Sequence, residues 1–300
     1  MQLPIEYLST FATIVREGSF EGAARALRVT PSAVSQRVRL MEERVGSVLL
    51  QRSRPVSVTE AGATLLRAAR QIDRVVDDVA RELGDGSARG AVVPIVVNAD
   101  SLATWFMPAL ARAARETDAR FEVLRADETV STEQLRRGAA MAAVTATRAA
   151  VPGCVSHRLG RMRYRAVATP AFAAAHFGDG VTPNALVTAP MLEFDRHDVF
   201  QQRFVRRITR ATIDPPRHFV PSSSEFARAI ELDMGWGMLP AAQCDAQLAQ
   251  GSLVELGADS SIALTLYWQR WNLESPMLDA LTRVITEAAA ESLEPAASKR

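Results

Sequence analysis

The sequence of 300 residues lacks the features that mark zinc-binding, disulfide-bonded, secreted and membrane proteins. Its two cysteines, Cys154 and Cys244, do not have the paired spacing of a zinc site or a disulfide framework, and its four histidines lack metal-ligand spacing. No apolar run approaches the ~18 residues of a membrane span. The first residues, MQLPIEYLSTF, lack the basic start and apolar segment of a secretory signal. We therefore expect a cytoplasmic protein with reduced thiols, no metal and no membrane segment.

Sequence motifs of common enzymes are also absent. A hydrolase of the α/β class would carry GxSxG, and neither this motif nor a phosphate-binding P-loop occurs. The segment Gly235-Trp236-Gly237 lacks the third glycine of a dinucleotide-binding motif and its strand–helix setting. The sequence therefore indicates no catalytic residues, and an enzyme is the disfavoured class of function.

Positive charge is concentrated near the start of the chain. The net charge is +1 and Lys299 is the only lysine, so the number of arginines by itself says little about nucleic acid. Their distribution says more, because eight arginines and four glutamates lie between Arg16 and Arg54. This local excess makes the N-terminal segment the part of the chain whose charge suits DNA.

The N-terminal segment predicts short helices joined by a tight turn. Apolar residues over 4–16 repeat on one helical face. Ser19 can cap a second helix over about 20–27. Thr30 and Pro31 open a third, because threonine is a good N-cap and proline suits the first helical position. The buried stripe of this third helix consists of Val34, Val38, Met41 and Val45.

The outer face of the third helix is polar, which is typical of a helix-turn-helix whose second helix enters the major groove of DNA. The segment over 48–58 predicts a short β-hairpin with arginines near its tip, placed for phosphates or the minor groove. The DNA contacts that these patterns predict are Ser32, Ser35, Gln36, Arg39, Arg52 and Arg54. A small helical bundle with a solvated polar face is the alternative.

A long helix is predicted over 59–83, with Thr59 as its N-cap. A helix of ~37 Å is longer than so small a domain can cover, so we expect a partner chain against its apolar side. That side is a roughly heptad seam of Leu65, Leu66, Ala69, Ile72, Val76, Val79 and Leu83. The residues from Gly84 to Ser87 are predicted to form a linker.

From Ala91 onward, apolar strand-like runs alternate with amphipathic helices, which predicts a mostly parallel α/β sheet. The alternation begins with AVVPIVVN and recurs from RYRAVAT onward, so we expect two such lobes. The final strand, ALTLYWQRW, and a helix over 276–292 are predicted to return to the first lobe.

A known family shares the N-terminal pattern. The run FxxAARALRVTPSAVSQRVRLMEERVGSVLLQR, followed by VTEAG, resembles the N-terminal domain of LysR-type transcriptional regulators. The resemblance covers the whole chain and implies an all-α winged helix-turn-helix, a long linker helix and an α/β effector domain of two lobes, similar to periplasmic binding proteins. Within the family the chain most resembles the arginine- and lysine-responsive regulators of basic amino-acid export. The segments that carry this narrower resemblance are VNADSLATWFMPAL, LRRG, FDRHD, PSSSEF and LYWQRW. By position alone, the family resemblance also implies DNA contacts at Pro31, Ser32, Ser35 and Gln36.

The resemblance also implies a division of the chain and a set of partners. It places a DNA-binding domain over 1–58, a linker helix and hinge over 59–90, and an effector domain over 91–300. Lobe I is expected over about 91–161 plus 266–300, and lobe II over about 162–265. The implied partners are double-stranded operator DNA, a basic amino acid (lysine, arginine or histidine) as effector, and further copies of the chain in homodimers and homotetramers. An amino-acid exporter gene is the implied target, no cofactor is implied, and RNA polymerase is left open as a partner.

The effector site is expected beyond the carboxyl ends of the strands, where helix N-termini converge in doubly wound sheets. Free N–H groups and hydroxyls at such ends suit a carboxylate, and acidic side chains suit a cationic group. An aromatic ring such as Trp105 or Phe194 can stack on an aliphatic stem. The predicted effector contacts are Asn98, Asp100, Ser101, Thr104, Trp105, Glu128, Thr145, Asp195, Ser222, Ser223 and Ser224.

Several of these residues also have structural interpretations. Asp100 can cap its helix, and Trp105 can belong to the core. Asp195 can pair with Arg196 or Arg203. For the whole chain, the alternative to a regulator is a nucleoid-associated or replication-control protein with little sequence preference, against which the near-neutral net charge argues.

Overall fold

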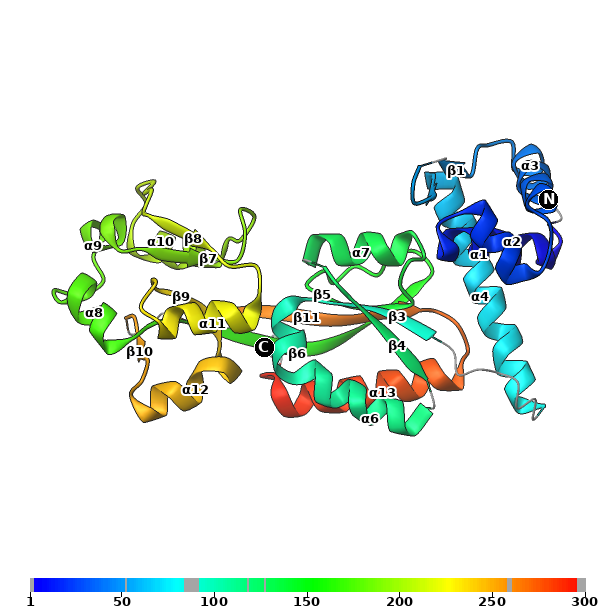
Figure 1. The fold of residues 1–300 in the computed structure, drawn as a ribbon. Helices are drawn as coiled ribbons and strands as arrows, with labels where there is room; N and C mark the ends of the chain where they lie inside the picture. Colours follow the sequence, from blue (N-terminus) through cyan, green and yellow to red (C-terminus); the bar gives the residue numbers. More distant parts are fainter. Residues whose placement is uncertain are drawn as a thin grey trace.

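The computed structural model describes residues 3–51, 53–83, 92–117, 119–126, 128–257 and 261–295, without the side chains of residues 77, 81, 82 and 128–130, and all structural statements refer to this part of the chain. Figure 1 shows three parts in chain order: a helical head, the long helix α4, and a two-lobed α/β part.

The head contains the predicted short helices. Its elements are α1 (Ile5–Glu17), α2 (Phe20–Leu27), α3 (Pro31–Val45), β1 (Leu50–Gln51) and β2 (Ser57–Val58). Two predicted caps are confirmed, because the Ser19 Oγ accepts from the Gly22 N–H at 3.0 Å and the Thr30 Oγ1 accepts from the Ala33 N–H at 3.2 Å. The core between the helices includes Leu8, Phe11, Ile14, Val34, Val38 and Met41.

Helix α4 (Glu60–Glu82) leaves the head and continues well beyond it (Figure 1). Thr59 caps it as predicted, with the Thr59 Oγ1 accepting from the Gly62 N–H at 3.1 Å. The first half of the apolar seam packs in the head core, whereas Val76 and Leu83 are 54% and 81% exposed. Among the described helices, α4 included, none is long and apolar enough to cross a bilayer. The predicted linker at 84–87 lies outside the described residues.

The main sheet differs from the prediction. Its seven strands are β3 (Val92–Val97), β4 (Arg120–Arg125), β5 (Ala142–Thr145), β6 (Cys154–Ala168), β9 (Gly237–Pro240), β10 (Val254–Glu255) and β11 (Ile262–Trp271). Only the pairs of β3 with β4 and β5 are parallel, while β6 and β11 pair antiparallel with each other and with their other neighbours. The prediction of a mostly parallel sheet is therefore wrong, because two long strands cross between the lobes in opposite directions.

The two lobes share β6 and β11. Lobe I adds α5 (Ala99–Ser101), the π-helical segment η1 (Leu102–Phe106), α6 (Met107–Thr117), α7 (Glu128–Arg136) and α13 (Pro276–Ser292) to β3, β4 and β5. Lobe II holds the parallel pair β7 (Met191–Glu193) and β8 (Arg217–Phe219), and α8 (Pro170–Phe177), α9 (Pro183–Thr188), α10 (Phe200–Ile208), α11 (Ser223–Glu231) and α12 (Ala241–Gln250). The predicted boundary between the lobes falls after Arg161 in β6 and after Thr265 in β11. These two residues pair across the ladder, so the two boundary positions lie opposite each other. The division into lobes at these residues stays a prediction.

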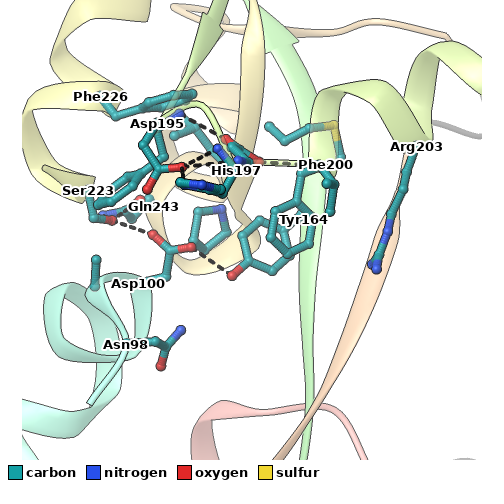
Figure 2. Close-up of a pocket in the computed structure, with 17 residues that line it drawn as sticks. Asn98, Asp100, Tyr164, Asp195, His197, Phe200, Arg203, Ser223, Phe226 and Gln243 are labelled. Atoms are coloured by element: carbon teal, nitrogen blue, oxygen red, sulfur yellow. Dashed lines mark hydrogen bonds and ion pairs between the residues drawn. The ribbon is translucent and has the colours of Figure 1, made fainter. Parts of the chain in front are cut away.

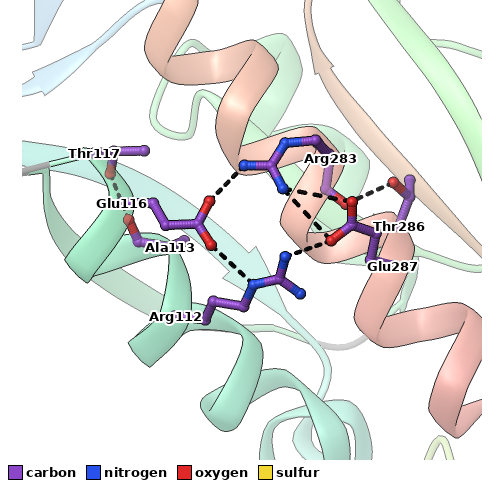
Figure 3. A network of polar contacts seen from close by, with 7 residues as sticks. All are labelled: Arg112, Ala113, Glu116, Thr117, Arg283, Thr286 and Glu287. Carbon is purple, nitrogen blue, oxygen red and sulfur yellow. Dashed lines mark hydrogen bonds and ion pairs between the residues drawn. The ribbon is translucent and has the colours of Figure 1, made fainter.

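The C-terminal helix α13 returns to lobe I, as the sequence predicts. Its buried side chains, Leu278, Leu281 and Ile285 among them, join the core that α6 also covers. On the outer side, Arg112 of α6 donates to Glu116 at 2.9 Å and to Glu287 of α13 at 2.5 Å, and Arg283 of α13 contacts Glu116 and Glu287 (Figure 3). Ion pairs as exposed as these contribute little stability, so the apolar contacts hold α13 in place.

Gly62→Ala tests the packing of α4 on the head. A Cβ atom at this position would lie 2.0 Å from the Leu49 carbonyl oxygen, so backbone must move. Alanine would otherwise favour a helix by about 1 kcal/mol, but we expect a net destabilisation of about 1–3 kcal/mol, as at other overpacked sites. Amide hydrogen exchange of α1 and α3 in the full chain measures the effect. Slower exchange in the variant than in the parent would contradict this packing.

Candidate ligand cavity and nucleic-acid interface

The predicted reading face of α3 is exposed. Pro31, Ser32, Ser35, Gln36 and Arg39 all have exposed side chains, opposite the buried stripe. Two of them have local partners, since the Ser32 and Thr30 hydroxyls lie 2.9 Å apart and the Arg39 Nε donates to the Glu43 Oε1 at 2.9 Å. Both partners lie on the same helix or at its cap, so the face stays open to a large ligand.

Arg37 on α3, and Arg52 and Arg54 in the hairpin segment, are further arginines of the head. Arg37 donates to the Thr10 Oγ1 at 2.9 Å and thereby fixes α3 on α1. Arg54 is exposed between β1 and β2, and the predicted contact Arg52 lies outside the described residues. DNA contact by all seven predicted residues stays a prediction.

A cavity of about 620 Å³ lies where lobe I meets lobe II (Figure 2), and this volume suits a small-molecule ligand. Residues from both lobes and from β6 form its wall. They are Asn98, Ala99, Asp100, Tyr164, Phe194, Asp195, His197, Asp198, Val199, Phe200, Arg203, Ser223, Phe226, Met238, Leu239, Pro240 and Gln243. Four predicted effector contacts, Asn98, Asp100, Asp195 and Ser223, are brought together here.

Asp100 bridges the lobes from the start of α5. Its Oδ2 accepts from the Tyr164 hydroxyl at 2.7 Å, and its Oδ1 accepts from the Ser223 hydroxyl of lobe II at 2.7 Å (Figure 2). The Gln243 amide donates to the same serine oxygen at 3.1 Å. The capping interpretation of Asp100 is wrong, because Asn98 is the N-cap residue and no side chain caps this helix.

A turn over residues 194–200 presents two more carboxylates. The Asp195 Oδ1 accepts from the backbone N–H of His197 at 2.7 Å and of Asp198 at 3.1 Å. Asp198 in turn accepts from the backbone N–H of Phe194 at 2.9 Å and of Phe200 at 3.0 Å. Backbone donors thus hold both carboxylates in place.

The alternative interpretation of Asp195, a pair with Arg196 or Arg203, is wrong. The Arg196 guanidinium lies over the Phe219 ring at 5.0 Å, and the Arg203 guanidinium lies over the Phe200 ring at 5.7 Å. Among the described residues, no arginine forms an ion pair with Asp100, Asp195 or Asp198. The cavity therefore gathers three carboxyl groups that no described arginine pairs with, and the His197 Nδ1 lies 3.7 Å from the Asp195 Oδ1.

Burial makes this charge costly. Loss of water raises the pKa of Asp100, although the Tyr164 and Ser223 hydroxyls that donate to it act in the opposite direction and nearby Asp198 adds to the rise. Loss of water likewise raises the pKa of Asp198, and the N–H groups of Phe194 and Phe200 partly offset this. A cation between these carboxylates would favour their charged forms.

One side of the cavity is aromatic. The Tyr164 and Phe200 rings stack with centroids 4.3 Å apart and an interplanar angle of 24°. Asn98 is 6% exposed, and its Oδ1 has no hydrogen-bond partner among the described residues. Apolar walls with a few fixed polar groups are typical of ligand sites, and a free buried acceptor suits a ligand N–H group.

Several predicted effector contacts do not line the cavity. Trp105 is a core residue, 5% exposed, with its ring 5.6 Å from that of Phe106. The Thr145 Oγ1 accepts from the Thr147 N–H, and the Thr104 hydroxyl donates to the Asp100 carbonyl. The remaining residues are Ser101, which is fully buried, Ser222, which precedes α11, and Ser224, which is exposed. The side chain of Glu128 lies outside the described part.

Sequence reasoning missed other wall residues. Asp198 and His197 lie in the FDRHD segment. Because this short segment contains two aspartates, the sequence itself could have indicated Asp198 together with Asp195. The sequence does not show where the Asp198 side chain lies, because the backbone N–H groups of Phe194 and Phe200 hold it in place within the turn. Tyr164 and Gln243 come from a strand and a helix remote from Asp100 in sequence, and no local pattern marks them.

Comparisons with known proteins give a consistent result. Residues 5–63 match the family "Bacterial regulatory helix-turn-helix protein, lysR family", and residues 91–290 match "LysR substrate binding domain". The "HTH-type transcriptional regulator LysG" of Mycobacterium tuberculosis is 41% identical over 289 residues, covering 96% of this chain and 94% of the relative. The "Lysine export transcriptional regulatory protein LysG" of Corynebacterium glutamicum is 40% identical over 295 residues, covering 97% and 99%.

A solved structure extends this likeness to three dimensions. Full-length LysG of Corynebacterium glutamicum with bound effector Arg matches with a TM-score of 0.82 and 37% identity, covering 97% of this chain and 100% of that chain. These proteins are named as regulators, so the comparisons do not support the alternative of a nucleoid-associated protein.

Asp100→Asn tests the electrostatic cost of burying this carboxylate. Because burial raises the pKa of Asp100, the folded chain holds this proton at pH values where the unfolded chain has lost it. The free energy of unfolding therefore falls as pH rises from about 4 through the raised pKa, and the variant should show less of this fall. Urea unfolding from acidic to neutral pH measures the difference. Asp179→Asn, at an exposed position, is the control, and equal pH dependence in the parent and Asp100→Asn would contradict the assignment.

Proposed function

The chain belongs to the LysR family of bacterial transcriptional regulators, and we propose on that premise that it senses a basic amino acid in the cavity between its lobes. It is a ligand-responsive transcriptional regulator. The observation that carries the proposal is the group of three carboxylates at the cavity, which no described arginine neutralises.

The cavity offers complementary groups for each part of such a ligand. Asp100, Asp195 and Asp198 suit the cationic side chain or the ammonium group, and Arg203 suits the α-carboxylate. The stacked rings of Tyr164 and Phe200 suit an aliphatic stem. The C. glutamicum relative with bound effector Arg supports arginine as one ligand, and its name supports lysine export as the regulated process. We therefore propose lysine or arginine as effector, with histidine next, and an amino-acid exporter gene as target.

DNA binding is proposed for the exposed face of α3. Its N-terminal residues Pro31, Ser32, Ser35 and Gln36 would face base edges, and Arg39 and the hairpin arginines would face phosphates. Two such heads are needed for an operator of two half-sites. The exposed apolar residues of α4 supply a surface for a dimer, and homodimers that pair into tetramers through the α/β parts complete the proposal. RNA polymerase is a further proposed partner.

Gln36→Ala should weaken binding to the specific operator by roughly 1–3 kcal/mol, because a glutamine can make two hydrogen bonds to a base edge. The variant should bind the effector like the parent, since Gln36 is remote from the cavity wall. Titration of labelled operator DNA at fixed salt measures the change. The control is Gln250→Ala, an exposed glutamine at the end of α12. Unchanged operator affinity in Gln36→Ala would contradict the proposed reading face.

A panel of amino acids should identify the effector through thermal unfolding of the purified chain. A ligand at about 100 times its dissociation constant adds ~2.7 kcal/mol to the stability of the folded state, which a melting curve resolves. We expect a shift with lysine, arginine or histidine and none with neutral or acidic amino acids.

Asp195→Asn should reduce that shift, because asparagine keeps an oxygen for the His197 and Asp198 N–H groups but carries no charge. Asp179→Asn, on the exposed segment between α8 and α9, should retain the full shift. A shift with neutral amino acids, or one that survives Asp195→Asn unchanged, would count against a cationic effector at this turn.

A further inference from the structure

Two side chains of lobe I contact the start of helix α11 in lobe II. One is Asp100, which accepts from the Ser223 hydroxyl at the cavity wall (Figure 2). The other is Arg125, the last residue of β4, whose Nη1 donates to the Pro221 carbonyl at 2.6 Å. Pro221 lies two residues before Ser223, so lobe I holds this segment of lobe II at two neighbouring points.

The parallel pair of β3 and β4 places these two side chains near each other. Val97 and Arg125 are partners in the ladder, and the Ala126 N–H donates to the Val97 carbonyl at 3.4 Å. Asp100 follows Val97 by three residues, in the helix α5 that comes after β3. The carboxyl ends of two neighbouring parallel strands therefore supply an aspartate and an arginine to the same segment of lobe II.

Arg125 also contacts the turn that carries two of the cavity carboxylates. Its guanidinium carbon lies 5.8 Å from the centre of the Phe194 ring, within the range of a cation–π interaction. Phe194 lines the cavity and directly precedes Asp195. One side chain of lobe I therefore touches lobe II at two places, the turn after β7 and the segment before α11.

The Arg125 contacts lie outside the cavity. Asp100 and Ser223 line it, so a ligand can compete for the hydrogen bond between them. Arg125 is exposed, and neither Arg125 nor Pro221, both in the described part of the chain, is a wall residue. A ligand can therefore occupy the cavity without displacing Arg125 from Pro221 or from Phe194.

We propose that Arg125 is a clasp between the lobes, and that a ligand enters and leaves the cavity only while the contacts of Arg125 with Pro221 and Phe194 are broken. Because the clasp can form with and without ligand, its loss should raise the association and dissociation rates by the same factor and leave the affinity unchanged. The loss of a side chain that binds the ligand itself would instead raise the dissociation rate and weaken the affinity. Arg125 is thus a positioning residue, and the kinetic consequence rests on the proposed function.

Arg125→Ala and Arg136→Ala form a matched pair for testing the clasp. Arg136 is also an exposed arginine of lobe I, but its ion pair with Glu133 lies within α7. A difference between the two variants therefore reports the contacts between the lobes and not the loss of an exposed arginine. Substitutions of exposed side chains usually change stability little, so we expect both variants to fold, which the melting temperature without ligand checks.

Stopped-flow fluorescence with arginine as the ligand measures the kinetic consequence. In Arg125→Ala both rate constants should rise together by roughly three- to tenfold, because more of the protein is open to the ligand. The dissociation constant should stay within about twofold of the parent value, and Arg136→Ala should match the parent throughout. A parent-like association rate in Arg125→Ala, with or without a loss of affinity, would overturn the clasp. Absence of arginine binding in the parent would count against the proposed function, and the next measurement then decides the clasp.

A distance measurement without ligand tests the clasp independently of the proposed function. Spin labels at Ala150 in lobe I and Ala175 on α8 in lobe II, both exposed, are placed in the full chain with its two cysteines replaced by alanine. Labelled chains are diluted with an excess of unlabelled chains, so that only distances within one chain are recorded. The parent and Arg136→Ala should give one narrow distribution, and Arg125→Ala a broader one or one at longer distances. A broad distribution in the parent, or an unchanged narrow one in Arg125→Ala, would overturn the proposal.

A second variant covers the case in which Arg125→Ala does not fold. Arg125→Gln keeps a polar side chain but is shorter and carries no charge, so it loses the cation over the Phe194 ring. The same broadening of the distance distribution is expected. A narrow distribution identical to that of the parent would overturn the clasp.

Discussion

The desolvation of carboxylates between the lobes is the constraint on which the rest of the structure depends. Asp100 and Asp198 lose water there, and burial raises the pKa of both. Two hydroxyls and two backbone N–H groups offset part of the cost, but hydrogen bonds from neutral donors leave the net charge in place. A cationic ligand would offset the remaining cost, and this is the physical basis of the proposal that the effector is a cation.

The strand pair β6–β11 connects the two lobes and so restricts how they can move relative to each other. Both strands run through both lobes, so a relative movement of the lobes that keeps this ladder intact is a change of angle about it. Asp100 comes from lobe I and Ser223 from lobe II, so the hydrogen bond between them holds one such angle. A ligand that competes for Asp100 would change the balance between these angles.

The sequence predicts the head well and the cavity only in part, for a physical reason. Ser19, Thr30 and Thr59 are caps whose hydrogen bonds span three residues, so local patterns identify them. The sheet direction was mispredicted because strand alternation does not encode whether a distant neighbour is parallel. Asp100 was found from its place after a strand, but its bond to Tyr164 joins residues 64 positions apart. Trp105 lies in the π-helical segment η1, directly after α5, and is buried in the core. The periodicity of an α-helix does not hold across such a segment, so it could not predict on which side Trp105 lies.

The most direct test of the central claim is calorimetric titration of the full chain with arginine and with citrulline, which has nearly the same shape without the positive charge. If the carboxylates recognise charge, arginine should bind at least about tenfold more tightly, corresponding to about 1.4 kcal/mol, and the difference should shrink in Asp195→Asn. Equal affinity for the two compounds would contradict the claim, because shape and the aromatic wall would then account for binding.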